Sequence, residues 1–594
     1  MCGIAGYYSF EGDIDSRIKE HFSSALKHRG PDGEGIFETL TQRGGRFLLQ
    51  HLRLSINDLK GGAQPLIGIN ASGQKISLSV NGEIYNAPEL KEHYKKYAFK
   101  TQSDCEPLLP LYLEYGSEFA RAIRGMYALA LYDESQDLLI LARDPFGIKP
   151  LYWRKNSQGF SFASTVDALL FPWEPVPDLN PQIQEEVLNL QFSCGSSTLF
   201  SGIFRLLPGE VLKISEGHIK DHFYVKALDF RQSQKKLQKY DALKKFEEVL
   251  TQTVSSHLMS DVPVGLFYSG GVDSSVILCA LNLLGHKETP AFYLNFEGEK
   301  SLLSKKFPLK AQYETIHFAE KDFWDLLPLS AHVMDDCAAD YAIMPTLKLA
   351  QRAAEHELRV ILSGEGGDEI FAGYGRYKKV LRPWFLGRRH LRHKSLLQGL
   401  GLLREDKGWR SGIENAESIF SSLPLSPLQK AQALDLRDWL PHDLMTKLDR
   451  SLMHFGIEGR PPFLDQKLAT FGFFLEDSLK IHKGQGKWLL KEWLYEKAPS
   501  LNPFTKKKGF TPPVGIWIAK KADLLGDLLK KQESLKIFCA PQKINDLFKT
   551  LGQKPDLKKE GMAAWIILFY ALWYKIHVER VSYGKDIFDI LEAP

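Results

Sequence analysis

One segment near the middle of the chain restricts the folds that the sequence can adopt. The apolar stretch VPVGLFY at residues 262–268 has the length of a strand, the glycine turn SGGVDSS follows it, and the apolar run VILCALNLL continues to residue 284. A second apolar strand at residues 360–362 leads into SGEGGDE. Strands that end in glycine turns and lead into helices indicate a parallel α/β sheet, which binds ligands at the carboxyl ends of its strands.

The first two hundred residues follow a different pattern. Apolar runs of strand length, separated by Gly, Pro, Asn and Asp, fall at residues 47–50, 76–80, 128–132 and 138–142. Helical segments interrupt them near residues 18–27 and 107–115, which predicts packed sheets with helices alongside. The last third is rich in predicted helices and ends in the aromatic run AAWIILFYALWY, which is expected to be a buried helix.

Composition excludes several classes of protein. A chain of 594 residues is too long for one ordinary core, so two or more domains are expected. The net charge is only +4, which favours neither a nucleic-acid nor a membrane partner. Six cysteines make no disulfide framework, and a reducing cytoplasm is the expected compartment. The longest apolar stretch, at residues 563–576, is shorter than the roughly 20 residues of a membrane helix, and the amino end lacks the basic region of a secretory signal.

A nucleophile is predicted at the amino end. If Met1 is removed, which a small residue at position 2 permits, Cys2 becomes the terminal residue. It then carries a thiol with an ordinary pKa of about 8.5 and an α-amine with a pKa of about 8. The amine can serve as general base for the thiol of the same residue, which gives an activated nucleophile without a histidine. Alone this is a weak signal, because a cysteine at position 2 usually has no function.

Five further sequence blocks strengthen the prediction that Cys2 is a nucleophile. They are HRGPDG at 28–33, HLRLSINDL at 51–59, NGEIYN at 81–86, QSDCE at 102–106 and ARDPFGIKPLY at 142–152. With MCGIAGYY they resemble the glutaminase domain of class II glutamine amidotransferases, whose nucleophile is an N-terminal cysteine. The resemblance assigns residues 2–212 to this domain and implies an Ntn-hydrolase αββα sandwich, an α+β fold.

The resemblance also implies which residues bind glutamine. Arg53 would hold the α-carboxylate, a task suited to a planar and permanently charged guanidinium, and Asp104 would pair with the ammonium. Asn81 and Gly82 would form the oxyanion hole, where preorganised donors meet the charge that develops on the attacked amide. Glu83 would add a backbone contact. The ordinary alternatives are that Arg53 belongs to a surface ion pair and that NGE is only a turn.

The turn SGGVDSS points to a phosphate site. Its glycines let backbone N–H groups approach an anion, and the N-terminus of the following helix adds a favourable potential. It lacks the Gly-Lys-Ser/Thr ending of the Walker motif and resembles the PP-loop of ATP pyrophosphatases, which cleave ATP between the α and β phosphates. That resemblance places pyrophosphate among Ser269, Gly270, Gly271, Asp273 and Ser274, with Asp273 helping to hold Mg²⁺. A plain turn is the alternative.

Four later blocks narrow the family: VILSGEGGDEIFAGYGRY at 360–377, KLDRSLMHFGIEGRPPFLD at 447–465, GKWLLKEW at 486–493 and KKKGFTPPVGIW at 506–517. They resemble the synthetase domain of glutamine-hydrolysing asparagine synthetases. The resemblance assigns residues 245–594 to a PP-loop α/β domain with a parallel sheet and a helix-rich C-terminal part. Residues 213–244, rich in Lys and Arg toward their end, are expected to form a linker.

This second resemblance also assigns roles. Ser363 and Gly364 would contact the nucleotide, Asp368 would be a second Mg²⁺ ligand, and Glu365 is a candidate general base for the attacking ammonia. Lys487 would neutralise phosphate charge. 

The same resemblance assigns less direct roles to four further residues. Phe267 and Leu294 match positions that line the adenine pocket. Arg460 and Asp465 are expected to form structural ion pairs.

The sequence departs from the family pattern near the expected acceptor site. The stretch at 295–318 lacks the Glu and the helix usually found there, and Cys337 stands where proline is common. From residue 370 to residue 404 there is no Asp or Glu but there are nine basic residues: Arg376, Lys378, Lys379, Arg382, Arg388, Arg389, Arg392, Lys394 and Arg404. A solvated basic surface is the plain interpretation. The sharper hypothesis is a field that attracts an acceptor larger than aspartate.

The predicted function joins the two chemistries. The acceptor carboxylate attacks the α-phosphorus of MgATP, and ammonia from glutamine hydrolysis, passing through an interdomain tunnel, displaces AMP. Aspartate, activated as β-aspartyl-AMP, is the leading acceptor. The alternatives are the same mechanism on another carboxylate, such as a uronic acid or a cell-wall precursor, and a descendant that binds nucleotide or glutamine without turnover. The expected partners are small molecules, with a homodimer as the oligomer to consider.

Overall fold

The computed structural model describes residues 2–298, 308–382, 385, 391–404, 408–505 and 512–593. Two six-stranded antiparallel sheets form its N-terminal unit. The first sheet has the order β10-β8-β9-β1-β3-β2. Its strands are β1 (Gly3–Ser9), β2 (Gly33–Leu40), β3 (Arg46–Arg53), β8 (Tyr152–Lys155), β9 (Gly159–Ala163) and β10 (Ile203–Arg205). The second has the order β12-β11-β7-β6-β5-β4. Its strands are β4 (Leu66–Ile69), β5 (Lys75–Ile84), β6 (Gly125–Asp133), β7 (Leu138–Arg143), β11 (Glu210–Ser215) and β12 (His218–Tyr224).

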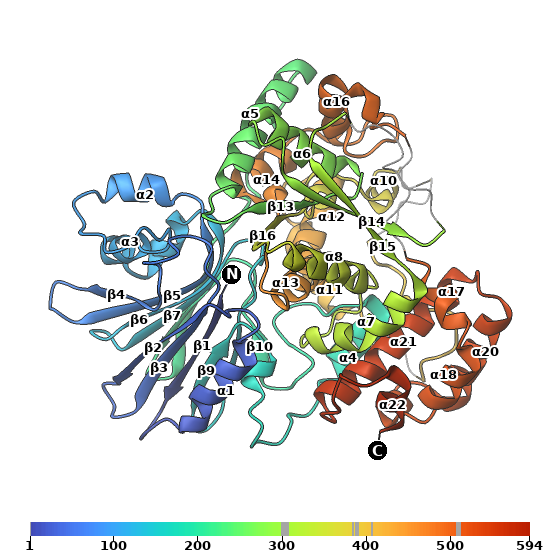
Figure 1. Ribbon diagram of the computed structural model, residues 1–594, viewed down its shortest axis with the longest axis horizontal. Coiled ribbons are helices and arrows are strands. Elements are labelled where there is room, and N and C mark those ends of the chain that lie inside the picture. The colour runs from blue at the N-terminus through green and yellow to red at the C-terminus, as the bar shows by residue number, and fades with distance from the viewer. Residues whose placement is uncertain are drawn as a thin grey trace.

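The period of two along β6 explains how the sheets pack. Ala130 and Tyr132 point into the core between the two sheets, whereas Leu129 and Leu131 point into a second core on the outer face. Helices α2 (Ala87–His93) and α3 (Leu108–Tyr115) cover that outer face, and α1 (Ser16–Leu26) covers the outer face of the first sheet. The predicted αββα sandwich is therefore confirmed (Figure 1).

The end of this unit differs from the prediction. The expected boundary at residue 212 falls inside β11, and the sheet continues through β12 to Tyr224. Residues 213–224, expected to belong to a linker, are held by hydrogen bonds of β12 to β11. The sequence did not predict β12 because almost all residues of this edge strand are exposed. The strand therefore lacks the alternation of apolar and polar side chains that marks a half-buried strand.

A parallel five-stranded sheet forms the second unit, in the order β15-β14-β13-β16-β17. Its strands are β13 (Val264–Phe267), β14 (Pro290–Phe296), β15 (Gln312–Phe318), β16 (Val360–Leu362) and β17 (Glu458–Arg460). The chain moves outward from β13 to β15 and then returns to β16 on the other side of β13. The carboxyl ends of β13 and β16 therefore flank the topological switch point, where open α/β sheets bind ligands.

Helices cover both faces of this sheet (Figure 1). The first four of these helices in chain order are α5 (Lys239–His257), α6 (Val272–Leu283), α7 (Glu320–Val333) and α8 (Ile343–Glu355). Those of the following region are α9 (Gly367–Ile370), α10 (Gly375–Val380), α11 (Ser411–Ser421), α12 (Pro427–Leu434), the π-helix η5 (Asp435–Met445), α13 (Thr446–Met453), α14 (Gln466–Phe473), α15 (Asp477–Lys480) and α16 (Trp488–Lys497).

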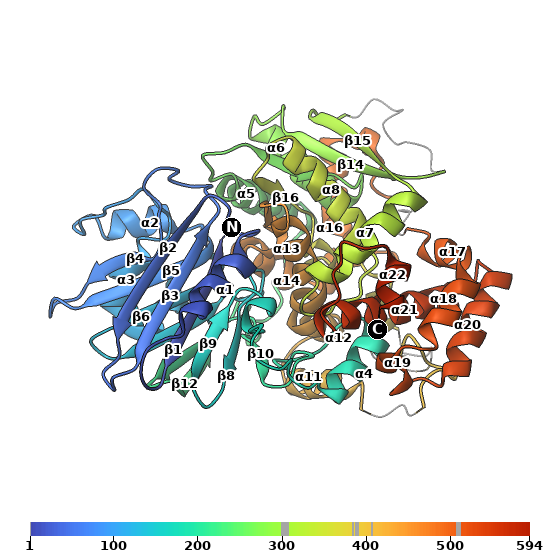
Figure 2. The same ribbon diagram turned by 60° about the horizontal axis from the view of Figure 1, so that its bottom comes forward.

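The remaining helices gather on the side of the molecule away from the antiparallel sheets (Figure 2). They are α17 (Val514–Ala519), α18 (Ala522–Leu529), α19 (Glu533–Lys536), α20 (Pro541–Gln553), α21 (Lys558–His577) and α22 (Ile587–Glu592), while α4 (Pro181–Leu190) reaches α21 from the N-terminal unit. The prediction of a buried helix is confirmed, because α21 is buried almost throughout. No helix of the described residues is long and apolar enough to cross a membrane.

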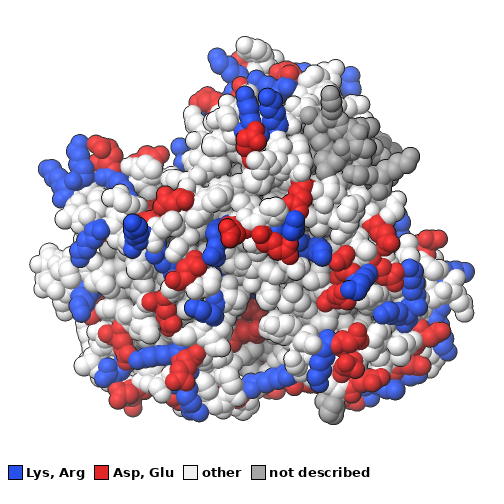
Figure 3. Space-filling model, in the orientation of Figure 1, with Lys and Arg blue, Asp and Glu red and all other residues white. Residues whose placement is uncertain are grey.

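Buried ion pairs join the two units. Arg29, which follows α1, is fully buried, and its Nη1 lies 2.7 Å from Oδ2 of Asp449 on α13. Arg205 on β10 pairs with Asp336 of the second unit, and Nη1 of Arg450 on α13 donates to the carbonyl oxygen of Ser164 at 3.0 Å. On the surface, by contrast, positive and negative side chains are interspersed over the face shown in Figure 3, in keeping with the net charge of +4.

The Arg29–Asp449 pair leads to a stability prediction. Arg29→Met leaves the Asp449 carboxylate buried without its cation, so we expect the free energy of unfolding to fall by about 3–5 kcal/mol. Chemical denaturation followed by tryptophan fluorescence measures the change. The matched control is Arg17→Met, which removes an arginine from an exposed pair with Asp15 and is expected to change little. Equal effects of the two substitutions would contradict the structural role of the buried pair.

Candidate functional site

Cys2 lies where the two antiparallel sheets and the parallel sheet meet, and the amino end of the chain is seen between the units in Figure 1. The backbone nitrogen of Cys2 donates to Oδ1 of Asn81, 3.1 Å away on β5. The thiol lies 3.9 Å from the carbonyl oxygen of Leu54. Burial raises the pKa of the Cys2 thiol, so a nearby base is needed to form the thiolate.

Asn81 and Gly82 offer hydrogen-bond donors next to this thiol. The Asn81 side chain is fully buried, and its Nδ2 has no hydrogen-bond partner among the described residues. Gly82 has a φ of +156°, and a Cβ atom there would lie 2.0 Å from the carbonyl oxygen of Met126. Only glycine fits at this point of β5, so the backbone close to Cys2 is kept free of side-chain atoms.

Two charged residues predicted to bind glutamine lie close to the ends of β3 and β5, one within a strand and the other in the loop before α3. Arg53 ends β3, and its Nη2 donates to the carbonyl oxygen of Asp58 at 2.6 Å. Asp104 accepts a hydrogen bond of 2.8 Å from the backbone nitrogen of Ile84, the last residue of β5. Burial raises the pKa of Asp104, and the hydrogen bond from Ile84 opposes that rise. Arg53 is thus part of a strand, whereas Asp104 is held against the end of β5 by a hydrogen bond from its own loop.

Glu83 makes a contact that the sequence did not predict. Its side chain is buried, accepts a hydrogen bond of 2.6 Å from Nδ2 of Asn57, and lies 2.8 Å from Nη2 of Arg460 at the end of β17. The residue after the predicted oxyanion-hole glycine thus forms an ion pair across the domain boundary. Arg460 and Asp465 do form ion pairs as expected, the second with Arg124 at 2.9 Å.

The PP-loop lies in the turn between β13 and α6. Gly270 has a φ of +66°, and Gly271 is the N-cap of α6. The hydroxyl groups of Ser269 and Ser274 lie 3.2 Å apart within this turn. A Cβ atom at Gly364, in the turn after β16, would lie 3.0 Å from Cβ of Asp273. The two glycine turns therefore meet at the switch point of the sheet, where a nucleotide is expected.

Lys487 links the two predicted metal ligands. Its Nζ lies 2.5 Å from Oδ2 of Asp273 and 2.5 Å from Oδ1 of Asp368. Burial lowers the pKa of the Lys487 ammonium, but the two carboxylates together raise it above its ordinary value. The ammonium is therefore charged at neutral pH and holds the carboxylates side by side.

These carboxylates fit a magnesium ion. Mg²⁺ in phosphate-binding sites takes one or two protein carboxylates together with phosphate oxygens and water. Asp273 and Asp368 converge on one cation, so they supply two hard oxygen donors at one place. A cluster of three or more His, Cys, Asp or Glu side chains suited to a metal is absent from the described residues. Two protein carboxylates leave the other positions around Mg²⁺ to phosphate oxygens and water, which suits an ion that arrives with a nucleotide.

A second charged cluster surrounds Glu365, and sequence reasoning missed most of it. Nζ of Lys447 lies 2.8 Å from Oδ2 of Asp340 and 3.8 Å from Oε1 of Glu365. Asp443, one turn earlier at the end of η5, is fully buried, and neither of its carboxylate oxygens has a hydrogen-bond partner among the described residues. Burial raises the pKa of Glu365 and of Asp443. Lys447 opens one of the motif blocks, but nothing in the spacing indicates that Asp340 reaches it.

The other predicted positions are placed as follows. Ser363 is buried, and its nitrogen donates to the carbonyl oxygen of Arg460 at 2.9 Å. Phe267 and Leu294 lie on the adjacent strands β13 and β14. The 295–318 stretch contains β15, and its residues 299–307 are outside the described residues.

The basic run after residue 370 is only partly a surface feature. Arg376 and Arg392 both pair with the buried Asp435, at 2.9 and 3.4 Å. Their guanidinium carbons also lie 3.8 Å from the ring centroid of Tyr374 and 4.2 Å from that of Trp439. These two cations therefore stabilise the fold around η5. Arg388 and Arg389, also part of the predicted field, are outside the described residues.

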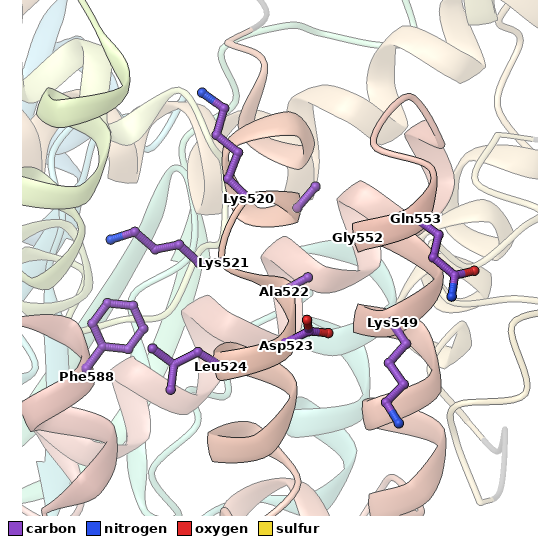
Figure 4. Close-up of a pocket in the computed structure, with 10 residues that line it drawn as sticks. Lys520, Lys521, Ala522, Asp523, Leu524, Lys549, Gly552, Gln553 and Phe588 are labelled. Atoms are coloured by element: carbon purple, nitrogen blue, oxygen red, sulfur yellow. The ribbon is translucent and has the colours of Figure 1, made fainter.

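A surface pocket of about 810 Å³ opens far from these sites, between α18 and α20 (Figure 4). Two of its three lysines have partners: Lys520 pairs with Glu320, and Nζ of Lys521 lies 4.3 Å from the ring centroid of Trp324. None of the predicted site residues lines it.

Comparison with known proteins identifies the family. Residues 245–575 match the family model of asparagine synthase, and residues 1–225 match that of the glutamine amidotransferase domain. The chain belongs to the asparagine synthase family. The match to the glutamine amidotransferase domain ends at residue 225, one residue after β12. This end agrees with an N-terminal sheet that includes β12.

Members of this family are similar over nearly the whole chain. Asparagine synthetase [glutamine-hydrolyzing] 1 of Bacillus subtilis is 28% identical over 98% of this chain and 97% of its own length. Asparagine synthetase B [glutamine-hydrolyzing] of Escherichia coli is 28% identical over 90% of this chain and 86% of its own. This asparagine synthase family member is thus an ATP-dependent, glutamine-hydrolysing ligase that acts on small molecules.

The separation of the two sites predicts uncoupling. Cys2→Ala is expected to abolish glutamate release from glutamine but to leave ATP-dependent amide formation from ammonium salts, because only the first reaction needs the thiol. Glutamate release and AMP formation are measured with each nitrogen source. Cys105→Ser, which changes a buried cysteine next to Asp104, serves as the control and is expected to keep both activities. Glutamine hydrolysis by the Cys2→Ala variant would refute the assignment of the nucleophile.

The Lys487 cluster generates a second prediction. Asp273→Asn and Asp368→Asn each supply less charge to a metal ion, so we expect AMP and pyrophosphate release to fall about 10- to 100-fold with either nitrogen source. Reaction of Cys2 with a glutamine-mimicking electrophile is expected to be unaffected. Asp241→Asn, on the first turn of α5, is the matched control. Normal AMP release by both site variants would rule out the metal roles.

Proposed function

We propose that this protein is a glutamine-dependent asparagine synthetase, which amidates aspartate through β-aspartyl-AMP and releases AMP and pyrophosphate. The choice of acceptor depends on one observation: the cluster of three carboxyl groups around Lys447 beside the nucleotide turns. The other parts of the reaction follow from the geometry around Cys2 and Lys487.

Glutamine hydrolysis takes place at Cys2. Once Met1 is removed, the α-amine accepts the thiol proton, and the thiolate attacks the side-chain amide of glutamine. Nδ2 of Asn81 and the backbone nitrogen of Gly82 stabilise the oxyanion, for which the unpartnered, buried Nδ2 is well suited. Arg53 and Asp104 bind the carboxylate and the ammonium of glutamine. Ammonia leaves, and water then releases glutamate from the thioester.

Acceptor activation takes place at the switch point of the parallel sheet. A carboxylate oxygen of the acceptor attacks the α-phosphorus of ATP, and the bond from that phosphorus to the bridging oxygen breaks. Backbone N–H groups and hydroxyls of the PP-loop, from Ser269 to Ser274, together with Lys487, bind the leaving pyrophosphate. Mg²⁺, when held by Asp273 and Asp368, neutralises phosphate charge. Ser363 and Gly364 contact the nucleotide, whose adenine lies against Phe267 and Leu294.

Amide formation completes the reaction. Ammonia attacks the acyl carbon of the adenylate, and AMP leaves with the bonding electron pair. Glu365 accepts a proton from the attacking nitrogen, a role that suits a carboxylate whose pKa is raised by burial.

The cluster around Lys447 favours an amino-acid acceptor. Lys447 is one cation among the carboxyl groups of Asp340, Glu365 and Asp443, so an acceptor without an ammonium group leaves the cluster short of positive charge. Asp443 is buried without a hydrogen-bond partner among the described residues, which is costly unless a ligand supplies a donor. The α-ammonium of aspartate supplies that donor, while Lys447 faces its carboxylate. A uronic acid carries hydroxyl donors but no ammonium group, so it does not supply the positive charge.

A panel of acceptors tests this proposal. Purified protein with MgATP and glutamine is given aspartate, glucuronate or diaminopimelate, and AMP release is measured. We expect turnover with aspartate, and we expect Asp443→Asn to raise the KM for aspartate about tenfold or more, since a neutral amide oxygen replaces the carboxylate that pairs with the ammonium. Glutamate release in that variant and both activities of the Asp241→Asn control are expected to be normal. Turnover with glucuronate or diaminopimelate but not with aspartate would overturn the choice of acceptor.

A further inference from the structure

The loop that follows β3 holds Arg53 and is itself bound by the synthetase domain. Nη2 of Arg53 donates to the carbonyl oxygens of Asn57 and Asp58, at 3.3 and 2.6 Å. The backbone nitrogen of Asp58 donates to Oδ2 of Asp261 at 2.8 Å, and the nitrogen of Asp261 donates to the carbonyl oxygen of Ile56 at 3.0 Å. Asp261 lies just before β13. One synthetase residue thus makes two hydrogen bonds to the loop that orients the guanidinium.

Asp58 also reaches the loop that carries Asp104. Its Oδ2 accepts a hydrogen bond of 2.8 Å from the nitrogen of Gln102, and its Oδ1 accepts one of 2.9 Å from the nitrogen of Gly61. Asp58 has a φ of +48°, a left-handed conformation that costs free energy for a residue other than glycine. The hydrogen bonds on both sides hold Asp58 in this conformation. A shift of Asp58 therefore moves both predicted glutamine-binding loops together.

The same loop is anchored from its other side by Arg460. Glu83 joins Asn57 to Arg460, with contacts of 2.6 and 2.8 Å. Nη1 of Arg460 also donates to the carbonyl oxygens of His257 and Met259, at 2.8 and 2.7 Å. The segment that leads to Asp261 and the residue that holds Glu83 are therefore one connected part of the synthetase domain.

We propose that Asp261 is a positioning residue for glutamine binding, through which the synthetase domain completes the glutamine pocket. It contacts no substrate in this assignment and acts through Asp58 on Arg53 and Asp104. The inference depends on the proposed roles of those two residues in binding glutamine. It does not depend on the acceptor, because glutamate release needs no aspartate. Asp261 is exposed, so its replacement removes a local contact without opening the core.

The test uses the full chain and compares Asp261→Ala with Asp261→Asn. Alanine removes the acceptor for the Asp58 N–H group, whereas asparagine keeps an oxygen there. We expect Asp261→Ala to raise the KM for glutamine about fivefold to tenfold with a much smaller change in kcat, and Asp261→Asn to restore nearly normal values. Alkylation of Cys2 by iodoacetamide, which requires neither Arg53 nor Asp104, and ammonia-dependent AMP formation are expected to stay normal. Asp241→Ala is the control for loss of an exposed aspartate.

Each other outcome contradicts the proposal. An unchanged KM for glutamine in Asp261→Ala shows that the contact positions nothing. A parallel loss of alkylation and of ammonia-dependent activity shows a general structural defect instead of positioning. An Asp261→Asn variant as impaired as the alanine variant shows that the hydrogen bond is not what matters. Arg53→Lys with a normal KM for glutamine would refute the glutamine site itself, which distinguishes that failure from a failure at Asp261.

Discussion

The buried charges between the two units are the constraint on which the rest of the structure depends. Arg29 donates from Nε to the carbonyl oxygen of Cys2, at 3.4 Å, and from Nη1 to Asp449 of the synthetase domain. A buried guanidinium is costly unless it is paired, so Arg29 favours the arrangement in which Cys2 and α13 lie on either side of it. Such pairs impose one orientation on the two domains, because a charged hydrogen-bonding geometry tolerates little displacement.

Because the two domains pack together in this way, only a few contacts connect the predicted glutamine site with the predicted nucleotide site. Glu83 follows the glycine predicted to form the oxyanion hole, and it pairs with Arg460. The carbonyl oxygen of Arg460 accepts a hydrogen bond from Ser363, which stands in the predicted nucleotide site. A single residue at the end of β17 thus contacts both predicted catalytic neighbourhoods. Its carboxylate partners, Glu83 and Glu458, come from different domains, and together they offset the cost of burying the guanidinium.

Local patterns predicted much of the fold and of the two candidate sites. The strands around residues 128–132 and 138–142 and the helix near 107–115 appear close to their predicted positions, because alternating or periodic apolar residues mark elements that cover a core. The turn after β13 was predicted from its glycines. The end of the N-terminal domain was predicted too early, since the exposed edge strand β12 carries no apolar pattern. The basic run after residue 370 was interpreted only by its charge, and the partners of Arg376 and Arg392 lie far along the chain at Asp435.

The sequence by itself determined the family, and it predicted the nucleophile and the phosphate-binding turn, because each depends on motifs whose residues lie close together in the chain. Only the tertiary structure revealed the cluster of Asp340, Asp443 and Lys447 and the bridge from Asp58 to Asp261. The cluster joins the segment before α8 to the junction of η5 and α13. The bridge joins a loop of the N-terminal domain to a loop of the synthetase domain. Charge pairing across such separations depends on how the chain packs, and no spacing rule within one element encodes it.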